Sequence, residues 1–216
     1  STTYNARFSS LKLVRSDAPT VFYRYDWKED ALDQWTNPST PEIDVSRYIA
    51  PKLEHYVADD GTKIPMFVLR PKACQNKVCP VIVSFHGGPE AMATPRFSPT
   101  HQFFTEQGFI YVQPNVRGSA GYGKKWIDAD NGPKRLDVLT DIRDAARWIK
   151  KNWAVDGKQP KVAAIGGSYG GYSVYMAMTR FAGEFDAGVA IVGMSSLLSF
   201  LQNTAPYRRD ARMGEY

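Results

Sequence analysis

The segment Gly166-Gly167-Ser168-Tyr169-Gly170-Gly171 decides how this sequence is interpreted. It contains Gly-x-Ser-x-Gly and lies between residues 161–165, which predict a strand, and residues 169–179, which predict a helix. A serine at such a turn has a strained backbone, and the helix amino terminus directs free N–H groups toward the same point. The alternative is a glycine-rich turn without chemistry. The context favours a nucleophile at Ser168, with the backbone N–H of Tyr169 as a donor to an oxyanion.

Strands and helices alternate along the chain from residue 64 onward. Residues 137–152 predict an amphipathic helix because Val138, Ile142, Ala145 and Ile149 recur on one face. Short apolar runs rich in β-branched residues predict strands at 64–70, 81–85, 109–113, 161–165 and 187–192. This alternation indicates the α/β class, with a mostly parallel sheet covered by helices on both faces.

The first forty residues follow a different pattern. Aromatic and polar side chains alternate in residues 20–26, and residues 10–14 and 32–36 are similar, so all three predict antiparallel strands. Residues 37–42 are rich in Pro, Ser and Thr and predict a linker. We therefore expect two units, residues 1–40 and residues 41–216.

A second glycine turn, His86-Gly87-Gly88-Pro89, follows the predicted strand 81–85. In hydrolases with a nucleophile elbow, the turn after this strand supplies the other oxyanion donor. We expect the N–H of Gly88 in that role, with Gly87 as second choice. His86 is expected to pack or hydrogen-bond rather than act as the base, because in this architecture the base follows the serine in sequence.

The sequence predicts no cofactor and no metal site. The glycine-rich segment 115–123 lacks the spacing of a dinucleotide fingerprint or of a P-loop, and His55 and His101 are isolated. Cys74 and Cys79 have no further cysteine or histidine nearby, so zinc is disfavoured. The two cysteines could close a small hairpin disulfide or stay as free thiols. A disulfide would weakly favour an oxidising compartment, but the compartment stays undecided.

Composition excludes several classes of protein. With 216 residues, 43% hydrophobic and 23% charged, the chain is globular rather than disordered. The apolar runs are shorter than the roughly 20 residues of a membrane-spanning helix, so we expect no membrane span. The net charge of +5 is spread along the chain, whereas a nucleic-acid face would need clustered basic residues. We therefore expect no nucleic-acid partner.

The three glycine-rich segments, in this order and spacing, resemble the catalytic domain of the prolyl oligopeptidase family. The resemblance runs from about residue 42 to the end, and His86-Gly87-Gly88-Pro89 is most similar to its acylaminoacyl-peptidase and dipeptidyl-peptidase branches. It implies an α/β-hydrolase fold and a serine peptidase that cleaves short peptides through an acyl-serine. It also implies that residues 1–40 are the last strands of a β-propeller, so that the partners of this chain are peptide substrates and the rest of its own enzyme.

The chain departs from this family in one respect. The catalytic triad of the family has the order Ser, Asp, His, but no histidine follows Ser168 in this sequence. We expect the triad Asp and His to lie outside this chain, which would then be a fragment that is inactive alone. A carboxylesterase or lipase and a non-catalytic binding protein with the same fold are the alternatives, since the elbow does not choose between amide and ester substrates.

Overall fold

The computed structural model describes residues 2–38, 42 and 44–216, and its first part is a small antiparallel sheet. Strands β1 (Phe8–Leu13), β2 (Val21–Asp26) and β3 (Ala31–Gln34) pair in that order, close to the predicted ranges. Arg7 closes the sheet at one end by an ion pair with the buried Asp26 at 2.8 Å. Residues 39–41 of the predicted linker, and with them the predicted boundary at residue 40, lie outside the described residues.

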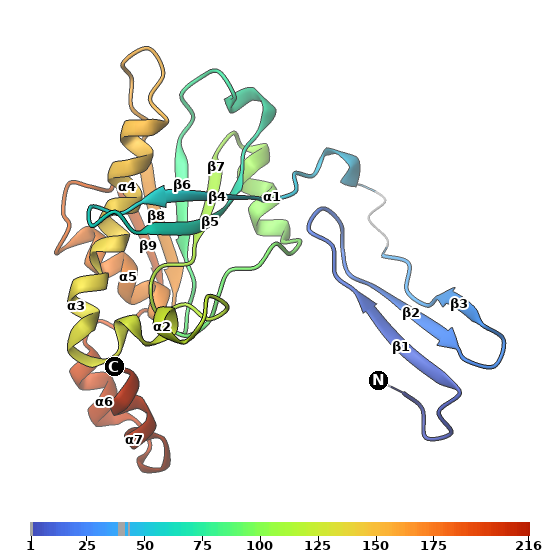
Figure 1. The fold of residues 1–216 in the computed structure, drawn as a ribbon. Coiled ribbons are helices and arrows are strands. Elements are labelled where there is room, and N and C mark those ends of the chain that lie inside the picture. Colours follow the sequence, from blue (N-terminus) through green and yellow to red (C-terminus); the bar gives the residue numbers. More distant parts are fainter. Residues whose placement is uncertain (1, 39–41, 43) are drawn as a thin grey trace.

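The second sheet is mixed and carries the body of the chain (Figure 1). Its strand order is β4-β5-β7-β6-β8-β9. The bounds are β4 Lys52–Val57, β5 Lys63–Leu69, β6 Val81–Phe85, β7 Ile110–Pro114, β8 Val162–Gly167 and β9 Ala187–Ile191. Strands β4, β5 and β7 pair antiparallel, whereas β7, β6, β8 and β9 are parallel. The pairing of Phe85 with Gly166 brings the carboxyl ends of β6 and β8 to one edge of the sheet.

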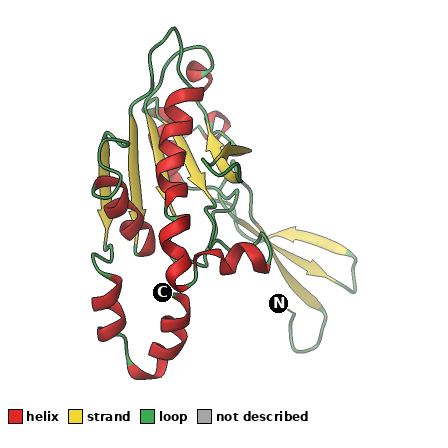
Figure 2. Ribbon diagram, turned by 60° about the vertical axis from the view of Figure 1, so that its left-hand side comes forward, coloured by secondary structure: helices red, strands yellow, loops and turns green. Residues whose placement is uncertain are grey.

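Helices cover both faces of this sheet, as the sequence predicts (Figure 2). Ile142, Ala145 and Ile149 of α4 are buried in the larger core, together with side chains of α5. Phe104 of α1 packs on the opposite face, in a smaller core. The helices are α1 Pro99–Glu106, α2 Lys124–Ile127, α3 Arg135–Val138, α4 Thr140–Asn152, α5 Tyr169–Met178, α6 Leu197–Asn203 and α7 Pro206–Glu215. The predicted helix 137–152 is thus divided into α3 and α4 at Leu139.

The two cysteines form a disulfide, which decides between the two readings left open above. The Sγ atoms of Cys74 and Cys79 are 2.10 Å apart. Both residues are only 4% exposed and belong to the larger core. The expectation that this disulfide closes a hairpin is wrong, because β7 lies between β5 and β6 in the sheet.

The last strand, β9, forms one edge of the described sheet. Its apolar side chains are poorly covered, with Val189 54% and Ile191 52% exposed, and Val192 beyond it is 85% exposed. Helices α6 and α7 follow at the carboxyl ends of the parallel strands (Figure 1). None of the helices in the described part of the chain has the length and apolar character needed to cross a membrane.

Candidate active site

Ser168 occupies the sharp turn between β8 and α5, where the sequence predicts it. Its backbone is left-handed, with φ 56° and ψ −118°, a strained conformation for a residue with a side chain. Its N–H donates to the carbonyl of Ile191 at 3.0 Å, which ties the turn to the end of β9. The side chain is exposed. An exposed serine with a strained backbone, at the carboxyl ends of the strands, is the geometry that the Gly-x-Ser-x-Gly pattern predicts.

Two glycines allow the strand and helix on either side of Ser168 to approach closely. A Cβ atom on Gly170 would lie 2.1 Å from the carbonyl oxygen of Phe85, and one on Gly166 would lie 2.4 Å from the backbone of Gly170. Real Cβ atoms do not come so close to backbone, so any larger residue would push β6, β8 and α5 apart. The elbow therefore depends on these glycines.

The turn after β6 lies against the elbow. A Cβ on Gly87 would be 3.6 Å from the Cβ of Ser168, which shows how near the two turns are. Gly88 has φ +117°, a region that favours glycine, and its carbonyl accepts a hydrogen bond of 2.8 Å from the hydroxyl of Tyr216. Tyr169 begins α5, and N–H groups in the first turn of a helix have no acceptor within that helix. The structure thus brings Ser168, Tyr169 and Gly88 together.

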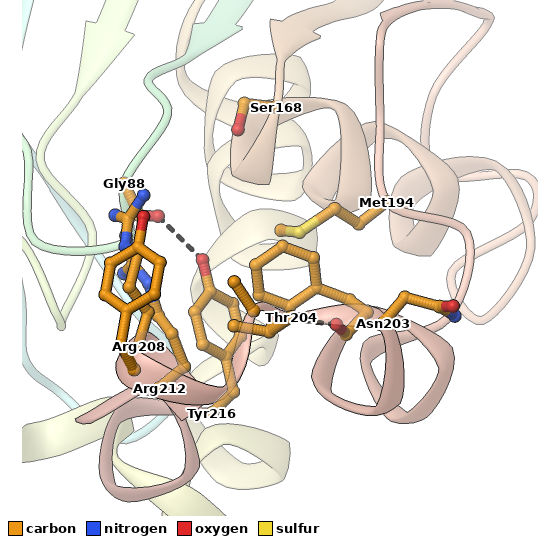
Figure 3. Close-up of a pocket in the computed structure, with 11 residues that line it drawn as sticks. Gly88, Ser168, Met194, Asn203, Thr204, Arg208, Arg212 and Tyr216 are labelled. Carbon is orange, nitrogen blue, oxygen red and sulfur yellow. Dashed lines mark hydrogen bonds between the residues drawn. The ribbon is translucent and has the colours of Figure 1, made fainter. Parts of the chain in front are cut away.

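A pocket of about 420 Å³ opens at this point (Figure 3). Gly88 and Ser168 line it from the two turns, and the rest of its wall comes from the segment after β9. That wall consists of Met194, Phe200, Asn203, Thr204, Ala205, Tyr207, Arg208, Arg212 and Tyr216. This wall is not predictable from the sequence, because it forms only when α6 and α7 fold back over the strand ends.

Two of the three histidines contact groups other than Ser168. His86 lies between the carbonyl of Gly87 at 2.7 Å from Nδ1 and the hydroxyl of Ser119 at 2.8 Å from Nε2, and burial lowers its pKa. His101 stacks on Tyr111 with ring centroids 4.4 Å apart, and burial lowers its pKa to about 4. His55 lies on the edge strand β4. Within the described residues, no histidine hydrogen-bonds to Ser168, so His86 holds the turn as expected.

A buried charged cluster next to Tyr216 of the pocket wall is not apparent from the sequence. Asp130 is 1% exposed and Arg135 is 2% exposed, and Arg135 Nη1 lies 3.2 Å from Asp130 Oδ2. The hydroxyl of Tyr169 is 3.4 Å from the same carboxylate oxygen. Burial raises the pKa of Asp130 to about 6 despite the nearby guanidinium, and burial raises the pKa of Tyr216 to about 12. No short motif announces this cluster, because its members come from four separate segments.

The glycine-rich segment 115–123 supports the site from below. The side-chain amide of Asn115 accepts from the N–H of Ala93 at 2.7 Å and donates to its carbonyl at 3.1 Å, which fixes the loop after the Gly88 turn. Gly118, with φ +103°, leaves room for a carboxylate, since a Cβ there would lie 2.4 Å from Asp130 Cγ. Among residues 2–38, 42 and 44–216, no three His, Cys, Asp or Glu side chains cluster as metal ligands would.

Comparison with known proteins places this geometry in a family. The prolyl oligopeptidase family matches residues 95–215. The chain is 41% identical over 195 residues, 87% of its length, to prolyl oligopeptidase A of Amanita bisporigera, of which it covers 25%. It is 30% identical over 200 residues, 89% of its length, to dipeptidyl aminopeptidase BIII of Pseudoxanthomonas mexicana, of which it covers 28%. The chain therefore spans about a quarter of the length of these curated relatives.

Solved structures show the same fold. Prolyl oligopeptidase B from Galerina marginata superposes with a TM-score of 0.80 and 29% identity, covering 97% of this chain and 29% of that one. A puromycin-hydrolyzing peptidase from Mycobacterium tuberculosis superposes with a TM-score of 0.81 over 97% of this chain and 33% of its own, but at 22% identity it supports the fold alone. These matches confirm the α/β-hydrolase fold predicted from the sequence. With the family match over residues 95–215, they establish that the chain belongs to the prolyl oligopeptidase family.

Proposed function

We propose that this chain is the nucleophile-bearing part of a serine peptidase that hydrolyses short peptides through an acyl-serine intermediate. One observation carries the proposal: the exposed hydroxyl of Ser168, on a strained left-handed turn, lines a pocket of about 420 Å³ together with Gly88. Activated nucleophiles at such turns react with carbonyl groups held at a helix amino terminus. The family match and the peptidases among the relatives support the same chemistry.

The proposed reaction has two steps. A base removes the proton of Ser168 while Oγ bonds to the peptide carbonyl carbon, and the resulting oxyanion accepts hydrogen bonds from the N–H groups of Tyr169 and Gly88. The C–N bond then breaks, the amine leaves with the proton from the base, and water releases the acyl group by the same route. We place the base and the acid that orients it outside these 216 residues, because all three histidines of the chain precede Ser168.

The amino-terminal sheet fits a second part of the proposal. Strands β1, β2 and β3 form an antiparallel sheet of three, which is one strand short of the four-stranded blade of a propeller. We propose that they complete a propeller that restricts access to the pocket, so that short peptides are preferred. The partners of the chain would then be peptides and the remaining strands of its own enzyme.

The test is to label the complete protein with a fluorophosphonate probe and to map the adduct. We expect the label on Ser168, and we expect Ser168→Ala to lose both labelling and hydrolysis of an aminoacyl p-nitroanilide. Loss of a triad member in a serine peptidase costs on the order of a millionfold in kcat. Ser195→Ala, at an exposed serine beyond β9, is the matched control and should keep full activity. A label on another serine, or undiminished turnover in Ser168→Ala, would contradict the proposal.

A further inference from the structure

Arg135, paired with Asp130, lies against the rings of Tyr169 and Tyr216. The guanidinium carbon of Arg135 is 4.9 Å from the ring centroid of Tyr169 and also 4.9 Å from that of Tyr216. The two rings meet edge to face, with centroids 6.0 Å apart. Arg135 Nη2 also donates to the carbonyl of Glu215 at 2.5 Å, next to Tyr216 in the chain. One buried cation therefore holds both tyrosines.

Each of these tyrosines is connected to one of the two proposed oxyanion donors. The N–H of Tyr169 is itself the donor proposed at the start of α5. The hydroxyl of Tyr216 donates to the carbonyl of Gly88 at 2.8 Å (Figure 3), which restrains a glycine turn that has no side chain of its own to fix it. A shift of Arg135 would thus be transmitted to both donors at once.

Stability alone does not account for this pair. The 3.2 Å contact of Arg135 with Asp130 lacks hydrogen-bond geometry, and Asp130 Oδ1, Arg135 Nε and Arg135 Nη1 have no hydrogen-bond partner among the described residues. A partly satisfied buried pair is usually less stable than apolar side chains of the same volume. The protein accommodates it with a glycine at position 118, where a Cβ would collide with the carboxyl group. Such a costly arrangement beside an active site indicates a functional role.

We propose that the Asp130–Arg135 pair positions the oxyanion hole: Arg135, held by Asp130, fixes Tyr169 and Tyr216, and these fix the N–H groups of Tyr169 and Gly88. The inference rests on the proposed function. Neither member of the pair lines the pocket, so both act as positioning residues through the tyrosines.

The test is the double variant Asp130→Asn/Arg135→Met in the complete protein. Removing both charges together leaves no unpaired ion in the core, so the fold should persist. We expect kcat to fall about 10- to 100-fold, less than the roughly 100- to 1000-fold loss when one oxyanion donor is deleted outright. KM should stay within about twofold, since the interaction is made in the transition state.

A second measurement separates positioning from general loosening. A peptidyl boronic acid forms an anionic tetrahedral adduct with the serine and so needs the oxyanion hole, whereas a product peptide does not. We expect the double variant to lose affinity for the boronic acid by the same factor as kcat, and to keep its affinity for the product peptide. Equal losses of affinity for both ligands would overturn the proposal.

The matched control is Arg143→Met/Asp144→Asn, which makes the same chemical change on α4. Arg143 Nη2 lies 2.7 Å from the carboxylate of Asp144, which is 2% exposed, and neither residue contacts the oxyanion elements. This variant should keep kcat and boronic acid affinity. Equal losses in both double variants would assign the effect to destabilisation and overturn the inference.

Tyr216→Phe tests the link to Gly88 without altering the buried charges. It keeps the ring against Arg135 and deletes only the hydroxyl, so we expect kcat to fall about tenfold with KM unchanged. Should the double variant fail to fold, this variant decides, and an unchanged kcat overturns the proposal. Absence of Ser168-dependent turnover in the wild-type protein would overturn both proposals, whereas wild-type turnover with unaffected variants overturns this one alone.

Discussion

Two arginine–aspartate pairs, each with a buried carboxylate, are built in opposite ways. Arg117 and Asp141 exchange a full set of bonds: Nε and Nη2 of Arg117 reach the carboxylate at distances from 2.5 to 3.2 Å, and the N–H of Arg117 donates to it at 3.0 Å. Arg135 and Asp130 share one contact without hydrogen-bond geometry. The first pair joins the loop after β7 to α4, whereas the second contacts Tyr169 at the start of α5.

This difference in hydrogen bonding separates a pair that stabilises the fold from a pair that acts on the candidate active site. A buried carboxylate whose oxygens all have donors stabilises the elements that it joins. A buried pair with vacant hydrogen-bonding positions contributes little stability and depends on the surrounding structure to hold it. Removing the first pair should therefore change stability, and removing the second should change turnover.

The largest effect on stability is expected from Arg117→Met. It leaves Asp141, which is fully buried, without its cation, and the cost should be about 3–5 kcal/mol of unfolding free energy. Denaturant unfolding measures it. Under conditions where the variant stays folded, Ser168 should react with the fluorophosphonate probe as well as it does in the wild type. A loss of unfolding free energy below about 1 kcal/mol, or a loss of labelling in the folded variant, would remove the distinction between the two pairs.

A smaller effect is expected from Asp130→Asn, through its dependence on pH. Burial raises the pKa of Asp130 from 3.8 to about 6, so between these values the folded state binds more protons than the unfolded state, and stability falls as pH rises. Arg135 and the hydroxyl of Tyr169 oppose this shift, and Glu215 adds to it. The variant should therefore gain about 2 kcal/mol relative to wild type between pH 4 and pH 7.

Unfolding titrations of both proteins at several pH values check this expectation. The comparison uses the difference between the two proteins, because other carboxyl groups titrate in the same range and cancel in it. A difference that does not change with pH would contradict the raised pKa of Asp130 in the folded protein.

The same contrast explains what the sequence could predict. The elbow is a local feature: strand, turn and helix occur within about twenty residues, and Gly166, Ser168 and Gly170 are read directly from the pattern. The helix over α4 follows from its 3.6-residue period. Strand β4 was missed because Lys52–Val57 is an edge strand whose mostly polar or exposed side chains lack a buried apolar run.

The remainder of the site could not be predicted, because it depends on contacts between distant segments. Asp130, Arg135 and Tyr216 meet Tyr169 only after α3, α5 and α7 have packed. Nothing in the immediate neighbours of Asp130, Arg135 and Tyr216 distinguishes these three from surface residues. A buried ion pair is recognisable from the structure alone, because its two residues look the same in sequence as those of an exposed ion pair. The disulfide was likewise left open, because its spacing suits free thiols equally well.

The smallest effect is expected at a third arginine, Arg208, which separates burial from mere nearness to the site. It lines the same pocket as Ser168 but is exposed, and no acidic partner pairs with it among the described residues. Water screens such a charge, so Arg208→Ala should change the unfolding free energy by less than about 0.5 kcal/mol. For a peptide with an acidic side chain near the scissile bond, kcat/KM should fall about two- to fivefold, because an exposed cation contributes at most about 1 kcal/mol to attraction. A neutral peptide of the same length should be unaffected.

Steady-state kinetics on the two peptides, at low and high salt, checks both expectations, because the effect of the substitution should shrink as the salt concentration rises. A hundredfold loss on both peptides would place Arg208 among the groups that shape the oxyanion hole, and exposure would then no longer distinguish it from Arg135.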